Sequence, residues 1–416
     1  MNHSEFTFRT AHVNEDFTRL KNLFDAVFGE KEKVGQLATT LFQHYPNTKP
    51  KYWFLAEHKT SGELAAAFTL IPWQWRWFGQ NLNVAEQGIV ATLPKYQGLG
   101  LQTRLNKMFD QCVATDGFDL AIIQGIPGFY HKFGYHYSLP IDNHVNLEWR
   151  QIPTIKEPRV RFRLATEQDI DFLIEQDEIT AAHFESSNFR NRETWQYLLT
   201  HSKATEYGSD FWIAESDNTA TAYFRRCYTG FGDGMIVSEA SENIPYTLAI
   251  ELLNFLKQEN TKHNKPYLRL NLSNQSGLSK IAHQLGAPIG KPYGFQIKIP
   301  CLLNWLIKQE TLLTERLLSS EQADFTGIFR LDFFPQAVDI QIINGSVKRI
   351  HDADEEREPT ASACIPTDLA PALLLGRHHW QELRQTRPDI FGHSRQSERL
   401  LEIMLPVISS WHHIPY

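Results

Sequence analysis

The chain has 416 residues, of which 42% are hydrophobic and 21% are charged, as in ordinary soluble globular proteins. Its length predicts roughly two to four domains, and its composition excludes a collagen-like rod, a coiled coil or long disordered segments. The net charge of −7 argues against a nucleic-acid partner, which would require many cations facing phosphates, and slightly favours a cationic one.

Metal, disulfide and membrane signals are missing from the sequence. The four cysteines form no CxxC pair, and the 17 histidines show no HExxH or Cys/His ligand spacing, so we expect reduced thiols and no metal site. The amino terminus lacks the basic and apolar regions of a signal peptide. The longest apolar stretches fall well short of the ~20 residues that span a bilayer. We therefore expect a cytoplasmic protein without a membrane span.

An internal repeat with a period near 150 residues predicts two duplicated domains. Phe8–Ala11 followed by Asp16 resembles Phe162–Ala165 followed by Asp169. In each copy a short strand leads into a helix, expected at 17–28 and 170–184. A strand–turn–strand unit follows in each copy, with turns at 59–62 and 216–219.

The remaining chain has a different pattern, which predicts a third domain of α+β class. Helical spacing over 302–318 precedes three alternating strands, and Asn344-Gly345 forms a hairpin turn between the last two. An acidic loop and then helices from 368 to 408 complete this region. The proline-containing segment 151–158 is expected to be a linker. The predicted boundaries are 1–150, 151–299 and 300–416.

One window, from Glu86 to Phe109, predicts an anion-binding site. An apolar strand, Gly88–Leu93, ends at Pro94 and is followed by a tight loop with Gly98 and Gly100. A helix begins after this loop, with one apolar face formed by Leu101, Leu105, Met108 and Phe109. The free N–H groups and the dipole of a helix amino terminus bind phosphate. The loop matches neither the P-loop nor the dinucleotide-binding fingerprint.

Two motifs resemble the GNAT acetyltransferases. Gln97–Gly100 is similar to their pyrophosphate loop, and Phe129–Tyr135 is similar to their later tyrosine motif. Gln102 departs from the family pattern, which has Gly or Ala there. Over its full length the chain resembles the Eis-type (enhanced intracellular survival) members. That resemblance implies a mixed α/β and α+β fold, with a catalytic GNAT domain, a degenerate second GNAT domain and a sterol-carrier-protein-like third domain.

The resemblance also implies which residues form the site. Tyr130 is expected to be the general acid, because a phenol is protonated at neutral pH. The main-chain carboxylate of Tyr416 is expected to be the general base, with Glu86 as the rival. The residues expected to bind the cofactor are Val90, Ala91, Thr92, Gln97, Gly98, Leu99, Gly100, Leu101, Gln102, Thr103, Gly125 and Ile126.

The expected activity is transfer of an acetyl group from acetyl-CoA to a primary amine. The resemblance implies an aminoglycoside, a polyamine or a lysine-like acceptor, and the sequence does not choose among them. It also implies a homo-oligomer, specifically a hexamer. The alternative is a non-catalytic protein with a vestigial GNAT fold, whose third domain binds a lipid or another small ligand.

Overall fold

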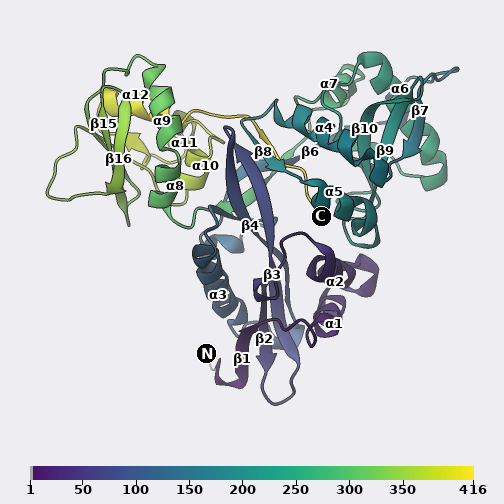
Figure 1. The fold of residues 1–416 in the computed structure, drawn as a ribbon, viewed down its shortest axis with the longest axis horizontal. Coiled ribbons are helices and arrows are strands. Elements are labelled where there is room, and N and C mark those ends of the chain that lie inside the picture. The colour runs from purple at the N-terminus through teal and green to yellow at the C-terminus, as the bar shows by residue number, and fades with distance from the viewer. Residues whose placement is uncertain (1–2) are drawn as a thin grey trace.

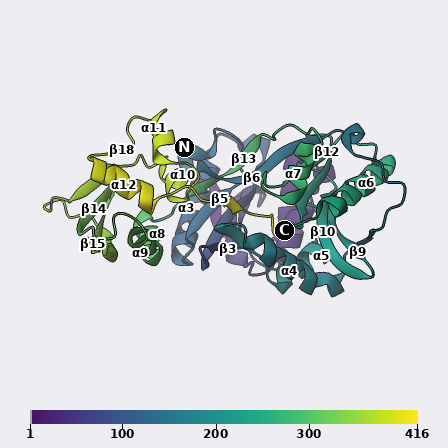
Figure 2. The ribbon, with the colours of Figure 1, turned by 90° about the horizontal axis from the view of Figure 1, so that it is seen from above.

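The computed structural model describes residues 3–416 and has three lobes around a long hairpin (Figure 1). The first lobe (3–135) is purple to blue, the second (136–300) is teal, and the third (301–409) is green to yellow. Seen from above, the second and third lobes lie on opposite sides of the first (Figure 2). Among the described residues, no helix combines the length and apolarity that crossing a bilayer requires.

The first lobe is a sheet covered on both faces. Its strands are β1 (Phe6–Thr10), β2 (Trp53–His58), β3 (Leu64–Trp77), β4 (Gln80–Thr92) and β5 (Leu120–Ile123). Helices α1 (Phe17–Phe28) and α2 (Val34–His44) cover one face, and α3 (Leu101–Thr115) covers the other.

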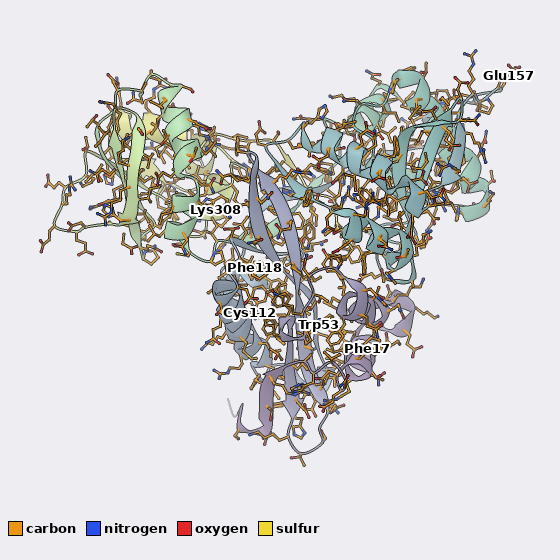
Figure 3. All side chains as sticks on the ribbon, in the orientation of Figure 1. Phe17, Trp53, Cys112, Phe118, Glu157 and Lys308 are labelled. Carbon is orange, nitrogen blue, oxygen red and sulfur yellow. The ribbon has the colours of Figure 1, made fainter. Side chains whose placement is uncertain are left out.

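Alternation along the strands forms the two cores of this lobe. Trp53 and Leu55 of β2 pack in the cluster of α1 and α2, whereas Phe54 and Ala56 pack in the cluster of α3. This is the two-residue period of a strand buried on both faces. Figure 3 shows Trp53 inside the lobe and Phe17 at the start of α1.

The second lobe repeats the layout of the first. Its strands are β7 (Arg161–Leu164), β8 (Ser186–Phe189), β9 (Ser209–Ser216), β10 (Thr219–Cys227), β11 (Met235–Ala240) and β12 (Leu268–Asn271). Its helices are α4 (Ile170–Ala181), α5 (Arg192–Thr200), α6 (Tyr246–His263) and α7 (Gly277–Gln284). Glu157, in the expected linker, lies at the outer edge of this lobe (Figure 3).

The repeat extends to individual ion pairs. In the first lobe Arg9 pairs with Asp16 and Glu57, at 2.6 and 2.7 Å. In the second, Arg163 makes the corresponding pairs with Asp169 and Glu215, at 2.7 and 2.6 Å. In each copy, an arginine at the corresponding position therefore joins the first strand to the start of the first helix and to the hairpin.

The two copies exchange strands. β13 (Pro292–Lys298), from the end of the second copy, inserts between β5 and β6 (His136–Leu147). It pairs with β5 through Gln296–Lys298, while the end of β6 pairs with β12. One continuous 14-stranded sheet results. The sheet of the first copy is therefore completed by β13, which follows the second copy in the sequence. The sheet of the second copy is completed by β6, which follows the first copy.

The third lobe is an α+β unit with its own five-stranded sheet. Its strands are β14 (Gly327–Asp332), β15 (Ala337–Ile343), β16 (Ser346–Asp352), β17 (Ala361–Cys364) and β18 (Phe391–Gly392). Its helices are α8 (Leu302–Lys308), α9 (Glu310–Leu318), α10 (Ala370–Leu374), α11 (Trp380–Arg384) and α12 (Arg395–Met404). The mixed α/β and α+β class expected from the sequence is confirmed. The likeness to a sterol carrier protein stays a prediction.

The contacts between the third lobe and the first include an ion pair and a side-chain hydrogen bond. Lys308 pairs with Asp119 at 2.7 Å, near the upper end of β4 (Figure 3). Trp77 Nε1 donates to Gln309 Oε1 at 2.7 Å. Gln309 lies where the helix expected over 302–318 divides into α8 and α9.

The final residues run back to the other two lobes. Strand β19 (Ser410–Trp411) pairs in parallel with β8, and β8 pairs antiparallel with the distal part of β3. The main chain of His413 donates to Asn188 Oδ1 at 2.8 Å. The tail (410–416) is thereby fixed between the first and second lobes, where the C label lies in Figure 1.

Candidate active site

Strands β4 and β5 diverge at their carboxyl ends. They pair only at Val84, Ala85 and Glu86 of β4. Beyond this point Ile89 takes a left-handed conformation, with φ of 52°, and the register between β3 and β4 shifts. A β-branched residue with positive φ is uncommon, and such strain clusters at functional sites. The bulge turns the end of β4, which includes Val90–Thr92, away from β5.

The glycine loop follows directly and presents free backbone donors. Gly98 and Gly100 both have φ of 76°, a conformation that favours glycine. The N–H groups of Gly100, Leu101 and Gln102 donate to no acceptor among residues 3–416. A Cβ on Gly98 would meet no atom within 4 Å. The amino terminus of α3 is therefore open to an anionic ligand.

Gln102 departs from the family pattern without blocking this opening. Its Nε2 donates to the carbonyl oxygen of Ala91 and to Thr92 Oγ1, both at 3.0 Å. The side chain thus folds back onto β4 and ties the first turn of α3 to the strand.

Tyr130 lies on the α3 side of the sheet. It begins a 3-10 helix, Tyr130–Phe133, and is 6% exposed. Its ring packs so closely on Gly125 that a Cβ there would lie 2.2 Å from Cδ2. Its hydroxyl has no hydrogen-bond partner among the described residues. Burial raises the pKa of Tyr130 to about 12, so the phenol stays protonated at neutral pH.

Residues of β13 hold the turn behind Tyr130. The hydroxyl of Tyr293 and the Nε2 of Gln296 both donate to the carbonyl oxygen of Gly125 at 2.8 Å. The exchanged strand therefore positions Gly125. Ile126, the next residue, is 65% exposed.

Glu86 lies on the opposite face of the sheet and is 2% exposed. Three neutral donors contact its carboxylate: Trp73 Nε1, Gln124 Nε2 and the Tyr416 hydroxyl, each at 2.9 Å. Burial raises the pKa of Glu86 to about 7, and the three hydrogen bonds oppose the shift without cancelling it. A carboxyl group poised near neutrality is suited to take up a proton.

Tyr416 connects this glutamate to the second lobe. Its ring meets Trp73, Tyr45 and Tyr207 edge to face, with centroids 6.1, 6.2 and 4.9 Å away. Its main-chain oxygen accepts a hydrogen bond from Arg225 Nη2 at 3.2 Å. Arg225 is in turn paired with Glu239 at 2.9 Å.

The predicted residues therefore divide between two faces of the opened sheet. Tyr130, Leu101 and Val90 pack in the α3 cluster, whereas Tyr416 packs in the α1–α2 cluster. The structure brings Tyr416 to Glu86, but through its phenol. The partners that the sequence did not single out are Gln124, Arg225, Tyr45, Tyr207, Tyr293 and Gln296. They come from distant segments, and local spacing gives no sign of their convergence.

The comparisons with known proteins agree on the fold. Residues 7–138 match the acetyltransferase (GNAT) domain family. No curated protein matches the chain. A GCN5-related N-acetyltransferase from Anabaena variabilis has a similar structure, with 12% identity and a TM-score of 0.69 over 98% of this chain and 99% of that one.

Two further structures are similar over the same extent. A probable N-acyltransferase from Enterococcus faecalis has 14% identity and a TM-score of 0.70, over 99% of this chain and 100% of that one. Eis1 from Mycobacterium abscessus has 11% identity and a TM-score of 0.59, over 97% and 98%. Residues 7–138 are therefore a GNAT acetyltransferase domain, in a chain that shares the full-length fold of GCN5-related and Eis-type proteins.

Proposed function

We propose that the protein transfers an acetyl group from acetyl-CoA to a primary amine. The match of residues 7–138 to the GNAT domain supports acetyl transfer in general. The observation that carries the proposal is the opening between β4 and β5. It has free amides and a protonated phenol on one face, and a carboxyl group with a pKa near neutrality on the other.

The residues around the glycine loop fit a pyrophosphate. The N–H groups from Gly98 to Gln102 would hold it, with Gln97 and Leu99 shaping the loop. The Thr103 N–H, which the sequence also suggested, already donates to the carbonyl oxygen of Gly100 at 3.1 Å. The main chain of Val90, Ala91 and Thr92 would align the pantetheine arm, with Gly125 and Ile126 on the opposite side of the opening. Acetyl-CoA supplies the activated acetyl group, and no metal is needed for its transfer.

The reaction requires one proton to be taken up and one to be donated. The amine nitrogen forms the new amide bond, the thioester C–S bond breaks, and CoA leaves as the thiol. Tyr130 would donate the proton to the departing sulfur. Its unpaired hydroxyl and raised pKa support this role.

Two carboxyl groups are candidates for the base. The main-chain carboxyl of Tyr416 is the one that the family resemblance implies, but the Arg225 guanidinium at its oxygen favours the anion and weakens proton uptake. Glu86 faces neutral donors alone and has the raised pKa. We therefore favour Glu86 as the base, with the Tyr416 phenol holding its carboxylate in position.

Binding of acetyl-CoA to the glycine loop is tested by the melting temperature. Acetyl-CoA should raise it, because a ligand that binds the folded state stabilises that state. Gly98→Glu should abolish the rise, since the new carboxylate enters the open space beside the free amides. A rise that persists in this variant would remove the loop from the cofactor site.

Gly117→Glu is the matched control. Gly117 also has positive φ, 71°, and free space at its Cβ, but follows the far end of α3. This variant has the same backbone strain and charge and should retain the full rise. Release of CoA thiol in the presence of a primary amine then tests the transfer itself.

A further inference from the structure

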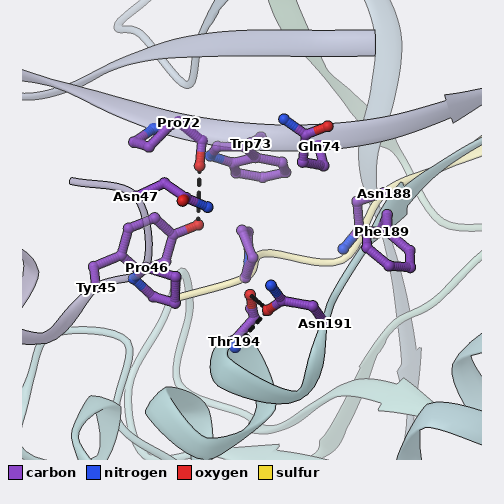
Figure 4. A pocket seen from close by; sticks show the side chains of 11 residues that line it. Tyr45, Pro46, Asn47, Pro72, Trp73, Gln74, Asn188, Phe189, Asn191 and Thr194 are labelled. Atoms are coloured by element: carbon purple, nitrogen blue, oxygen red, sulfur yellow. Dashed lines mark hydrogen bonds between the residues drawn. The ribbon is translucent and has the colours of Figure 1, made fainter. Parts of the chain in front are cut away.

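A small pocket, partly open to solvent, lies where the first lobe, the second lobe and the tail meet; it is the cavity shown in Figure 4. Tyr45, Trp73 and Phe189 contribute aromatic walls, and Gln74, Asn188 and Asn191 contribute amides. Every described residue that lines the cavity is uncharged. The cavity is therefore polar, and its lining, among the described residues, has no carboxylate that could pair with a cation.

Asn188 offers the cavity a buried donor without a partner. Its side chain is 3% exposed, and its Oδ1 accepts a hydrogen bond from the His413 main chain at 2.8 Å. That bond fixes the orientation of the amide. Nδ2 is left without an acceptor among the described residues, and Figure 4 shows it on the cavity side. An unpaired buried N–H costs free energy that a ligand oxygen would recover.

Asn191 offers a second donor beside it. Its Oδ1 caps helix α5, accepting from the N–H and the hydroxyl of Thr194, each at 2.9 Å. The amide is therefore also oriented, and its NH₂ group makes no hydrogen bond within the described part of the chain. The cavity adjoins the amino terminus of α5, whose dipole favours negative charge. Two donors and a helix dipole thus act at the same end of the cavity.

Three residues link the cavity to the surroundings of the proposed base. Trp73 lines it and donates to Glu86. Pro415 lines it and directly precedes Tyr416, while Tyr45 lines it and packs against the ring of Tyr416. Glu86 does not itself line the cavity: the Trp73 ring, which donates to its carboxylate, separates the two, so the amine end of a bound molecule would have to extend beyond the cavity toward Glu86.

We propose that this cavity binds the body of the acceptor amine through a carbonyl-type oxygen, either a carboxylate or an amide carbonyl. The inference rests on the proposed function and narrows its acceptor class. Asn188 and Asn191 donate to the oxygen, and the aromatic walls contact the carbon chain. A polyamine fits poorly, because its second ammonium would be desolvated there without a carboxylate partner.

Three amines with the same five-carbon chain test the proposal: 5-aminopentanoate, 5-aminopentanamide and 1,5-diaminopentane. They differ only in the far end, which is a carboxylate, an amide or an ammonium group. We expect kcat/KM for the amide or the carboxylate to exceed that for the diamine at least about 10-fold. A factor of this size corresponds to the net contribution of one or two hydrogen bonds. The ranking of the first two compounds distinguishes the two oxygen sources.

Asn191→Asp is the diagnostic variant. Aspartate keeps the helix cap, but it removes the donor and places a negative charge at the cavity. KM for 5-aminopentanoate should rise at least about 10-fold, whereas KM for the diamine should stay constant or fall. Asn344→Asp, in the exposed hairpin turn of the third lobe, should change neither value. A diamine preferred over both oxygen-bearing amines, or an unchanged ratio in Asn191→Asp, overturns the proposal.

Calorimetric titration separates this inference from the proposed function. If no amine causes release of CoA thiol, the proposed function fails. Direct binding of the same three compounds still tests whether the cavity prefers an oxygen-bearing group. Tighter binding of 5-aminopentanamide than of 1,5-diaminopentane, lost in Asn191→Asp, supports it. Equal or reversed affinities overturn it.

Discussion

The first and second lobes place a buried glutamate on corresponding strands and give it opposite chemistry. Glu86 lies on β4 and Glu239 on β11, and each strand runs between a hairpin strand and a parallel neighbour. Glu86 faces neutral donors, and burial raises its pKa to about 7. Glu239 contacts Arg190 and Arg225, which act together with nearby His413 to overcome the effect of burial and lower its pKa to about 2.

The difference shows how one fold can hold a proton acceptor or a permanent anion. Both glutamates are almost completely buried, so burial alone does not decide their charge. The partners do, because neutral donors leave the cost of desolvation largely uncompensated, whereas guanidinium groups compensate it. The second lobe also holds the tail in place, because its Arg225 donates hydrogen bonds to the main-chain oxygens of Ile414 and Tyr416.

Loss of Glu86 should have the largest effect. Glu86→Gln keeps the volume and removes the proton acceptor, so kcat should fall by about 10²–10⁴. The wild-type rate should rise with pH through about 7, as the carboxyl group ionises, and this dependence should vanish in the variant. Thiol release across a pH series measures both.

Two glycines added after Tyr416 test the rival base. They move the main-chain carboxyl by ~7 Å of extended chain and leave Glu86 in place. If Glu86 is the base, the extension should lower kcat less than Glu86→Gln. A near-wild-type rate in Glu86→Gln with a large loss in the extended chain would transfer the role to Tyr416.

Loss of Glu239 should destabilise the protein. Glu239→Gln leaves Arg190 and Arg225 without a shared anion in a buried site, which should lower the free energy of unfolding by about 3–5 kcal/mol. Denaturant titration at neutral pH measures the change. Glu215→Gln is the control, because it breaks the more exposed pair with Arg163 and should cost less than about 1 kcal/mol. Equal losses in both variants would contradict the anchoring role of the second lobe.

The sequence predicted local structure and the glycine loop, but not the convergence of distant segments. Phe17–Phe28 has the predicted bounds, and β15 ends directly before the predicted turn, because periodicity is a local property. The turn at Asn344-Gly345 has positive φ at both residues, as its type requires. Local motifs are also enough to indicate Tyr130 and the glycine loop.

The strand exchange and the Glu86 centre could not be derived in the same way. β13 reaches β5 across more than 160 residues of chain, and no spacing rule indicates which copy it completes. The sequence indicates Glu86 only as a rival base, because its three donors come from β3, the residue after β5 and the tail. The electrostatics of the site depend on these non-local contacts.

The smallest predicted effect is a pH dependence of stability with opposite sign in the two lobes. Folding raises the pKa of Glu86 from its ordinary value of 4.5 to about 7, so the folded state binds this proton more tightly than the unfolded state. The stability from Glu86 is therefore greatest at low pH and is lost as the pH rises from about 4.5 to 7, by about 3 kcal/mol. Glu239, with its lowered pKa, instead stabilises above pH 4.5 and loses that contribution as the pH falls toward 2. Because glutamine cannot ionise, Glu86→Gln should become more stable relative to wild type by about 3 kcal/mol between pH 4.5 and 8, measured by urea unfolding. A difference that stays constant over this range would mean that Glu86 is already ionised at pH 4.5. It would then resemble Glu239, and the contrast between the two lobes would be lost.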